Sequence, residues 1–241
     1  MRFLAILICL AFERWTSFNR VIRQNDLFKY YLNLMDTITK KIKLNKYLKL
    51  SFDIIPLLII VLIIWILLLK VLFGLFAFLF SIVVLCYCLG NFDLTSEDDE
   101  IGHIFLRANS HIFSILFWFG ILGPVGAVLI RFTSVLVNEN VLSDRSEAAK
   151  QLQQVLDWVP IRLETFSFAL VSHFVKVLSC WTKTFFSGLN RNADVLVECG
   201  MTAIDESAED VSIEARKAAA MAIIDRGIIV WLVVMALTIL I

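Results

Sequence analysis

The chain has 241 residues, of which 59% are hydrophobic and 18% are charged, with 22 basic and 22 acidic side chains. Soluble domains average about 45–50% apolar and about 25% charged residues, so this composition excludes an ordinary soluble domain, as does a mean hydropathy of +0.82. The zero net charge gives no reason to expect nucleic acid as a partner. We therefore expect an all-α integral membrane protein forming one domain over residues 1–241, with about four to five transmembrane helices plus amphipathic interfacial helices.

Residues 3–12 form an apolar run, FLAILICLAF, that would extend only about 15 Å as a helix. This is too short to cross a hydrocarbon core of about 30 Å, and the run lacks the small-residue cleavage site of a signal peptide. We expect a packed or half-inserted helix. Glu13 follows directly, and a buried carboxylate there would need a basic partner, which an arginine could supply.

The next segment, residues 13–50, carries nine Lys and Arg residues against three acidic ones. Basic residues beside a span favour the cytoplasmic side and the anionic headgroups of lipids. Aromatic residues interleave with the basic ones, and beside a membrane this pattern favours an interfacial segment over nucleic-acid binding. We expect residues 13–50 to lie at the cytoplasmic surface, with membrane lipids as partners.

Residues 52–90 are almost entirely apolar and are interrupted by Lys70. A single helix of this length would extend about 55 Å, nearly twice the hydrocarbon thickness. The sequence therefore predicts a hairpin of two spans, 52–69 and 72–90, with Lys70 at the turn. Residues 91–110, which include an acidic run, are expected to form a solvated loop.

The third predicted span, residues 111–136, concentrates helix breakers: Gly120, Gly123 and Gly126 lie three apart, and Pro124 follows Gly123. Spacing by three places the glycines on one face of a helix, where another backbone can approach closely. Pro124 removes a helical hydrogen bond, so we predict a helix broken at Gly-Pro. The break serves either helix packing or a site for a ligand or ion lined by backbone.

Two polar residues bracket this broken helix. Asn109 precedes it and is expected to cap it. Arg131 lies near its end and is either an interfacial anchor or part of a pocket for an anionic group.

Residues 143–156 are expected to form an amphipathic surface helix. In residues 157–181, Asp157 is expected to cap a new helix, with Pro160 in its first turn. Polar residues spaced by three and four, including Arg162, form one stripe. This helix either spans the membrane with its stripe toward protein or lies at the interface.

His173 lies on the same stripe and is expected to be a structural histidine. Residues 182–203 are expected to be a connection. Residues 204–224 begin acidic and end basic, which suits a helix dipole, and this amphipathic helix is expected to continue into the last span, 225–241.

The sequence contains no Gly-rich phosphate loop and no GxSxG motif, so no enzyme class follows from motifs alone. We expect no cofactor and no metal site, because the three histidines and five cysteines lack zinc-type spacing. The cysteines are expected to be reduced small hydrophobes; they are Cys9, Cys86, Cys88, Cys180 and Cys199.

Two segments, NSHIFSILFWFGILGPVGAVLIR (109–131) and VLDWVPIRLETFSFALVSHF (155–174), resemble the AmpE family of bacterial inner-membrane proteins. LAFERW (10–15) is similar to the start of that family. The resemblance implies a regulatory, signalling-type protein, multi-pass in the inner membrane. It also implies a link to induction of chromosomal β-lactamase and so to antibiotic resistance. Cell-wall recycling fragments, or a soluble amidase that degrades them, are the partners it implies.

The same family is distantly similar to the CobD/CbiB synthases of cobalamin assembly, which use ATP to condense an amino-alcohol with a corrinoid carboxylate. Their Asp-x-x-Pro-x-Arg-Leu element matches Asp157, Pro160, Arg162 and Leu163. An ATP-dependent synthase or transferase is therefore the alternative to a non-enzymatic regulator. After Arg131 the chain reads FTSVLVNEN where those synthases carry Asn-Thr-Leu-Asp, and this departure favours the regulator.

Arg131, Asp157 and Arg162 are the residues for which we hold two hypotheses. In one, the arginines form a two-cation pocket in which Asp157 orients one and the other binds an anion. In the other, the arginines are interfacial anchors and Asp157 is a helix cap.

Topology provides a first test. Because the basic residues of 13–50 adjoin the first long span, a reporter fused after Lys46 should be active only if it functions in the cytoplasm. Paired fusions to alkaline phosphatase and a fluorescent protein measure this. Phosphatase activity without fluorescence would place the segment on the opposite side.

Overall fold

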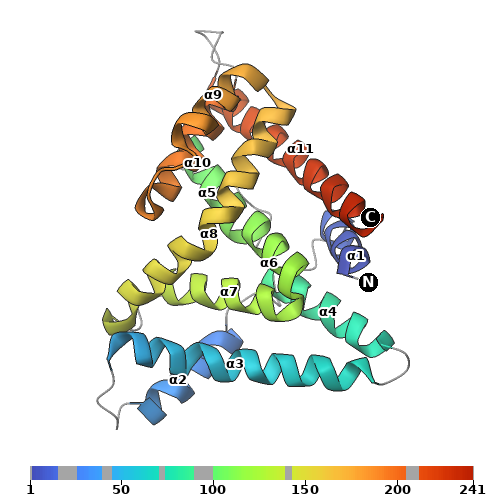
Figure 1. Cartoon of the computed structure of the whole chain (residues 1–241), viewed down its shortest axis with the longest axis vertical. Coiled ribbons are helices and arrows are strands. Elements are labelled where there is room, and N and C mark those ends of the chain that lie inside the picture. Colours follow the sequence, from blue (N-terminus) through green and yellow to red (C-terminus); the bar gives the residue numbers. More distant parts are fainter. Residues whose placement is uncertain are drawn as a thin grey trace. The chain divides into compact units, whose positions relative to one another are not determined.

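A computed structural model of the chain describes residues 2–15, 26–39, 45–70, 74–89, 100–138, 143–204 and 212–240 (Figure 1). Every regular element within these ranges is a helix, which confirms the all-α fold. The elements are α1 (Arg2–Trp15), α2 (Asp26–Thr39), α3 (Lys46–Leu69), α4 (Leu75–Cys88), α5 (Ile101–Ala108), the π-helical turn η3 (Asn109–Phe113), α6 (Ser114–Leu122), α7 (Pro124–Asn138), α8 (Ser143–Val171), α9 (Phe174–Thr184), the short 3-10 helix η4 (Leu189–Arg191), α10 (Asn192–Ala203) and α11 (Ile213–Leu240).

Three stretches of the described chain are long and apolar enough to cross a membrane: Lys46–Leu69, Ile101–Leu122 and Ile213–Leu237. The 24 residues of α3 extend about 36 Å at the helical rise, more than the hydrocarbon core requires. Shorter apolar helices cover Arg2–Ala11, Leu75–Cys88 and Pro124–Val137. The exposed positions of α3 are largely Ile and Leu, as expected of a surface that faces lipid.

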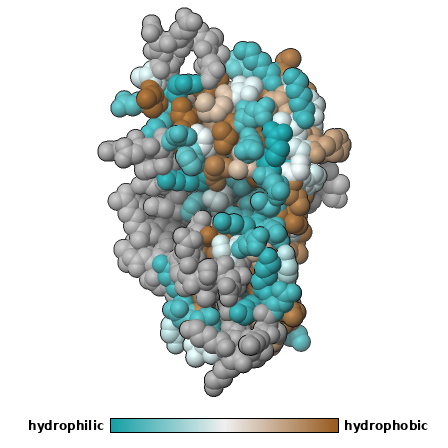
Figure 2. All heavy atoms as spheres, turned by 90° about the vertical axis from the view of Figure 1, so that its left-hand side faces the viewer, coloured by the Kyte–Doolittle hydropathy of each residue, from teal (hydrophilic) through white to brown (hydrophobic). Residues whose placement is uncertain are grey.

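Contacts divide the chain into two compact units, and each is described by itself. The first comprises Met1–Asn91 and Ile115–Gln153, and the second comprises Phe92–Ser114 and Gln154–Ile241. In the first unit α3, α4 and α7 pack against one another, and α1 lies along α4. In the second unit α10 packs against α5 and α9, while α11 also lies along α5 (Figure 1). One face of the molecule, seen in Figure 2, displays hydrophilic side chains interspersed with hydrophobic ones.

The predicted hairpin agrees with the structure, since α3 ends before Lys70 and α4 packs back against it. Gly74, before α4, has φ of 84°, a left-handed conformation that glycine adopts without a steric penalty. The first helix begins at Lys46 rather than at residue 52. The second is 14 residues long, about 21 Å, and so shorter than a full span.

The third predicted span differs from the structure at both ends. The helix begins at Ile101 instead of residue 111 and ends at Leu122, where Gly123 has φ of 70°. Pro124 then opens α7, a position where its missing N–H costs little. The Gly-Pro break is confirmed, and the loop expected over residues 91–110 is wrong for its last part, which is α5.

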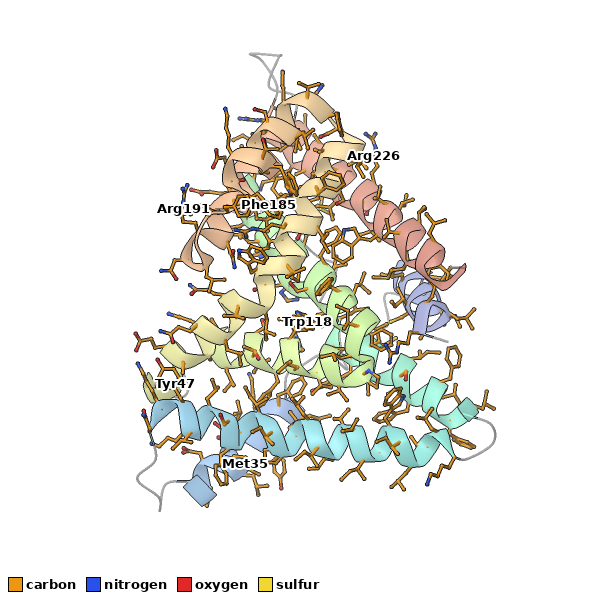
Figure 3. The ribbon with its side chains drawn as sticks, in the orientation of Figure 1. Met35, Tyr47, Trp118, Phe185, Arg191 and Arg226 are labelled. Atoms are coloured by element: carbon orange, nitrogen blue, oxygen red, sulfur yellow. The ribbon has the colours of Figure 1, made fainter. Side chains whose placement is uncertain are left out.

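The expectation that the three glycines share one helix face is wrong, because Gly120 lies on α6 and Gly126 lies on α7. Gly126 instead permits the start of α7 to pack directly against the backbone of α6. A Cβ atom there would lie 2.1 Å from the backbone oxygen of Trp118, the residue on α6 that Figure 3 labels. Only glycine fits this approach of α7 to the preceding helix.

The second half of the chain contains a longer helix than predicted. Asp157 was expected to start a helix and Pro160 to lie in its first turn, but both lie inside α8, which begins at Ser143. Pro160 removes the N–H that the Leu156 carbonyl would accept, at a cost of about 3 kcal/mol. The helix continues because its neighbours Asp157 and Arg162 are buried and held by other elements.

The polar stripe predicted along 157–181 is interrupted, because α8 ends at Val171 and His173 lies at the junction before α9. The connection predicted over 182–203 is wrong for its last part, which is α10. Asp194 in the first turn of α10 suits the helix dipole. The continuous α11 confirms that the amphipathic segment runs into the last apolar span, while residues 205–211 lie outside the described ranges.

The close approach at Gly126 predicts a strong dependence on its missing side chain. Gly126→Ala should destabilise the fold by about 1–3 kcal/mol, because the Trp118 backbone has to shift. Thermal unfolding in detergent measures this. Gly188→Ala is the matched control, since nothing lies within 4 Å of the added Cβ. Equal unfolding temperatures for the two variants would contradict the packing assigned to Gly126.

Candidate functional site

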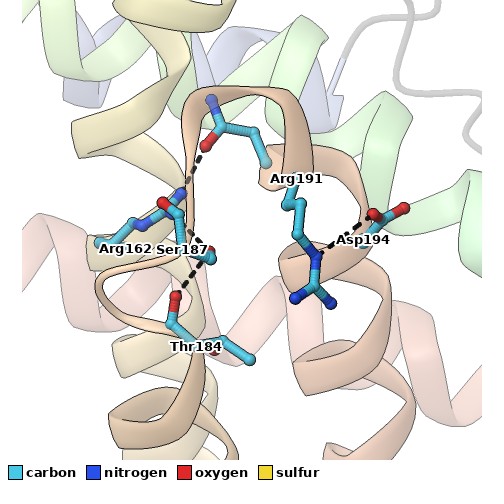
Figure 4. Close-up of polar contacts among 6 residues, drawn as sticks. Arg162, Thr184, Ser187, Arg191 and Asp194 are labelled. Carbon is cyan, nitrogen blue, oxygen red and sulfur yellow. Dashed lines mark hydrogen bonds and ion pairs between the residues drawn. The ribbon is translucent and has the colours of Figure 1, made fainter.

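Arg162 on α8 is a buried cation of the second unit, with 3% of its surface exposed. Its Nε donates to the Phe185 carbonyl at 3.3 Å, and Nη1 donates to Asn192 Oδ1 at 2.6 Å. Nη2 donates to the backbone oxygen and Oγ of Ser187 at 3.1 and 3.0 Å (Figure 4). The guanidinium carbon lies 5.0 Å from the centroid of the Trp158 ring. Each of these partners is uncharged, so within the part of the chain that the structure describes, dipoles and an aromatic face stabilise the guanidinium charge.

The acceptors come from the connection between α9 and α10 and from Asn192, the first residue of α10, and further hydrogen bonds fix this region. Ser187 Oγ donates to the Thr184 carbonyl at 2.7 Å, and Asn192 Nδ2 donates to the Gln154 carbonyl at 2.7 Å. Trp181 Nε1 donates to the Arg162 backbone oxygen at 2.8 Å. The loop is therefore built around the guanidinium, and burial lowers the pKa of Arg162 from its ordinary value without removing its charge.

Aromatic rings close the same region. The centroid of Phe185 lies 4.6 Å from that of Trp181 and 6.1 Å from that of Trp158. Figure 3 shows Phe185 among the side chains next to α8, whereas Arg191 points away from the helices. The next residue, Phe186, is 90% exposed, so the loop carries a large apolar side chain in the open.

A second polar cluster joins Asp157 to the π-helical turn η3. Ser114 Oγ lies 2.7 Å from Asp157 Oδ1 and 2.9 Å from Asn109 Oδ1, and it can donate its proton to either. All three residues are buried. The expectation that Asn109 caps a helix is wrong, because it lies in a π turn within a continuous helical stretch. Single π turns inside α-helices occur frequently at functional sites.

Glu164 is the functional candidate that our reading of the sequence missed. It is fully buried on α8, and neither of its carboxylate oxygens has a hydrogen-bond partner among the described residues. Burial, and to a smaller extent the charge of Asp157, raises the pKa of Glu164 well above its ordinary value. Its spacing of seven residues from Asp157 was the available signal, because two helical turns place both acids on one face.

The remaining predicted residues lie elsewhere. Arg131 is buried on α7 in the first unit, as are Gly123, Pro124 and Gly126 at the break. His173 lies at the α8–α9 junction, and Glu13 lies in α1 outside the side chains that the structure describes. Of the predicted residues, Asn109 and Asp157 are thus connected through Ser114. Arg162 forms its hydrogen bonds with other residues, among them Asn192.

Four of the five cysteines approach one another in pairs. Cys9 and Cys86 Sγ atoms lie 2.6 Å apart in the first unit, and those of Cys180 and Cys199 lie 2.8 Å apart in the second. None of the five cysteines forms a disulfide bond. The described residues include no group of three or more His, Cys, Asp and Glu side chains placed to hold a metal ion.

Comparison with known proteins identifies relatives for this region. Residues 99–241 match the family model described as "Regulatory signalling modulator protein AmpE". The cobalamin biosynthesis protein CobD of Chromobacterium violaceum is 29% identical over 126 residues, covering 47% of this chain and 40% of that protein. CobD of Stutzerimonas stutzeri is 30% identical over 99 residues, covering 36% of this chain and 33% of that protein. The chain thus spans less than half the length of either relative, and no solved structure matches it.

The geometry around Arg162 predicts that its shape matters as well as its charge. Arg162→Lys should lower stability by about 2–3 kcal/mol, because a single ammonium cannot reach Phe185, Ser187 and Asn192 together. Thermal unfolding measures this. Arg191→Lys, at an exposed side chain paired with Asp194 at 3.8 Å, should change stability by less than about 0.5 kcal/mol. An equal loss of stability in the two variants would show that the groups around Arg162 do not require an arginine.

Proposed function

Because this chain belongs to the AmpE family, we propose that it is a multi-pass protein of the bacterial inner membrane that modulates induction of chromosomal β-lactamase. In this proposal it responds to fragments released in cell-wall recycling by binding an anionic group at Arg162. The matched residues 99–241 include Arg162 and every element that surrounds it. The family supplies the regulatory role, and the geometry of the second unit supports the chemistry of the ligand.

The observation that carries the proposal is a buried guanidinium whose acceptors are all neutral. Removing a cation from water is costly, and dipoles recover only part of that cost. An anionic ligand would replace the carbonyl and hydroxyl acceptors of Phe185 and Ser187 with a stronger, charge-assisted partner. Wall fragments that carry peptides have carboxylates, whose two oxygens match the fork of an arginine.

Access to Arg162 would come through the loop between α9 and α10. Ser187 and Phe185 contribute their acceptors from this loop, so opening it would free the guanidinium without breaking α8. The exposed Phe186 beside these residues offers an apolar surface for the ligand or for a protein partner. A soluble amidase of the same pathway is the partner that we propose.

A second candidate function follows from the similarity to the two CobD proteins. An ATP-dependent synthase or transferase would use Arg162 to hold a substrate phosphate or carboxylate. Incubation of the purified protein with ATP, an amino-alcohol and a corrinoid carboxylate tests this directly. Amide formation that depends on the protein would replace the regulatory proposal, whereas we expect the ATP to remain intact.

The sharpest test of the proposed function keeps Arg162 and compensates its charge with a new neighbouring carboxylate. Asn192→Asp puts a carboxylate at the position 2.6 Å from Nη1 and should therefore satisfy the buried charge while excluding an anionic ligand. In a host that lacks its own AmpE-type protein, this variant should abolish the chain's effect on β-lactamase induction. The substitution also removes the hydrogen bond from Asn192 Nδ2 to the Gln154 carbonyl, so the variant should unfold at a lower temperature than the wild type, and its folding has to be verified before induction is compared.

Asn190→Asp is the matched control, because it adds the same charge two residues away at an exposed position. It should support induction like the wild type when both are present at equal levels in the membrane. Normal induction by Asn192→Asp would refute an anion site at Arg162. Loss of induction by both variants would show that added negative charge on this loop disturbs something other than that site.

A further inference from the structure

Glu164 lies on one continuous buried face of α8. Asp157, Ile161, Glu164 and Phe168 follow the spacing of a single helix face, and all four are buried. At one end of this face Asp157 contacts Ser114 at 2.7 Å. At the other end, the Phe168 ring lies 6.2 Å from that of Phe113, measured between centroids.

These two contacts determine what Glu164 faces. Ser114 and Phe113 are adjacent residues at the end of the π turn η3, and Glu164 lies between their partners along α8. The side chain of Glu164 is therefore directed at the turn. A third helix closes the enclosure, since a Cβ on Gly227 of α11 would lie 3.3 Å from Ser167 Oγ and 3.4 Å from both rings.

Within this enclosure both carboxylate oxygens of Glu164 lack hydrogen-bond partners from residues 2–15, 26–39, 45–70, 74–89, 100–138, 143–204 and 212–240, which the structure describes. Each unsatisfied buried polar atom costs about 1–3 kcal/mol, whether the acid is ionised or neutral. Buried polar groups without partners in native proteins point to a bound water, an ion or a functional role. The oxygen atoms of Asn109, Ser114 and Asp157, which interact at the same turn, supply further polar groups beside it.

We propose that Glu164 and the π turn η3 form a binding site for a small monovalent cation, of which Na⁺ is the representative. The donors are oxygen atoms, which favour hard cations over transition metals. The Asp157 carboxylate already accepts a hydrogen bond from Ser114, so Glu164 is the carboxylate left to balance a cation, and it balances one positive charge. Mg²⁺ would require near-octahedral coordination and generally retains several waters. Irregular helical backbone supplies cation ligands in the same manner in membrane transporters.

The cation site is independent of the anion site proposed at Arg162. Residues 162 and 164 are two apart on α8, so they project about 200° from one another around the helix. Cation binding can therefore be tested without any ligand from the cell wall, and its failure would leave the proposed function unaffected.

The experiment uses the full chain, purified in detergent, with NaCl replaced stepwise by choline chloride at constant ionic strength. Na⁺ should raise the unfolding temperature by about 3–6 °C at saturation, as expected for a ligand that binds only the folded protein. Equilibrium binding of ²²Na⁺ should show a single saturable site. Glu164→Gln should lose both effects, because the amide is isosteric but carries no charge.

Glu198→Gln, at an exposed carboxylate on α10, is the control and should retain both effects. If Glu164→Gln does not fold, the wild-type measurements decide alone. No saturable ²²Na⁺ binding, with equal unfolding temperatures in Na⁺, Li⁺, K⁺ and choline, would overturn the proposal. So would stabilisation by Mg²⁺ alone, or a folded Glu164→Gln protein that retains its response to Na⁺.

Discussion

The second unit depends on one constraint: ionisable side chains that are buried away from water need polar partners inside the protein. Arg162 and Glu164 are both buried on α8, and a helix cannot satisfy such side chains from its own backbone. Other elements have to supply the partners. For Arg162 the partner is a loop of neutral acceptors, and the position of that loop sets where α9 ends and α10 begins.

Packing of α10 against α5 depends on small residues at the points of closest approach. A Cβ on Gly200 of α10 would lie 2.7 Å from the ring of Phe105 on α5. At Gly102 the nearest atom would be a Val197 methyl at 3.0 Å. Helices in lipid gain little from hydrophobic association, so close van der Waals contact of this kind provides much of their cohesion. Because these glycines carry no side chain, large aromatic rings can fill the space around Phe113 and Phe168.

The two buried ionisable side chains of α8 connect the two proposed sites to one helix. In these proposals, an anion would neutralise the guanidinium of Arg162 and a cation would neutralise the acid of Glu164. Binding at either side would change the free energy required to keep an ionisable side chain of α8 buried. A regulator requires states that differ in free energy by a few kcal/mol, and buried charges with incomplete partners provide differences of that size.

The membrane character, the hairpin at Lys70, the break at Gly123-Pro124 and the family could all be predicted from the sequence. They depend on composition, local backbone preferences and a specific run of residues. The sequence did not determine the start of α8, since tertiary contacts at Asp157 and Arg162 keep Pro160 inside a helix that local rules would end. Glu164 has no recognisable motif, and its enclosure without a hydrogen-bond partner among the described residues became visible only in the folded chain. Whether a polar side chain of α8 is buried, and which groups it contacts, depends on residues distant in sequence, so these properties follow from the tertiary structure and not from local patterns.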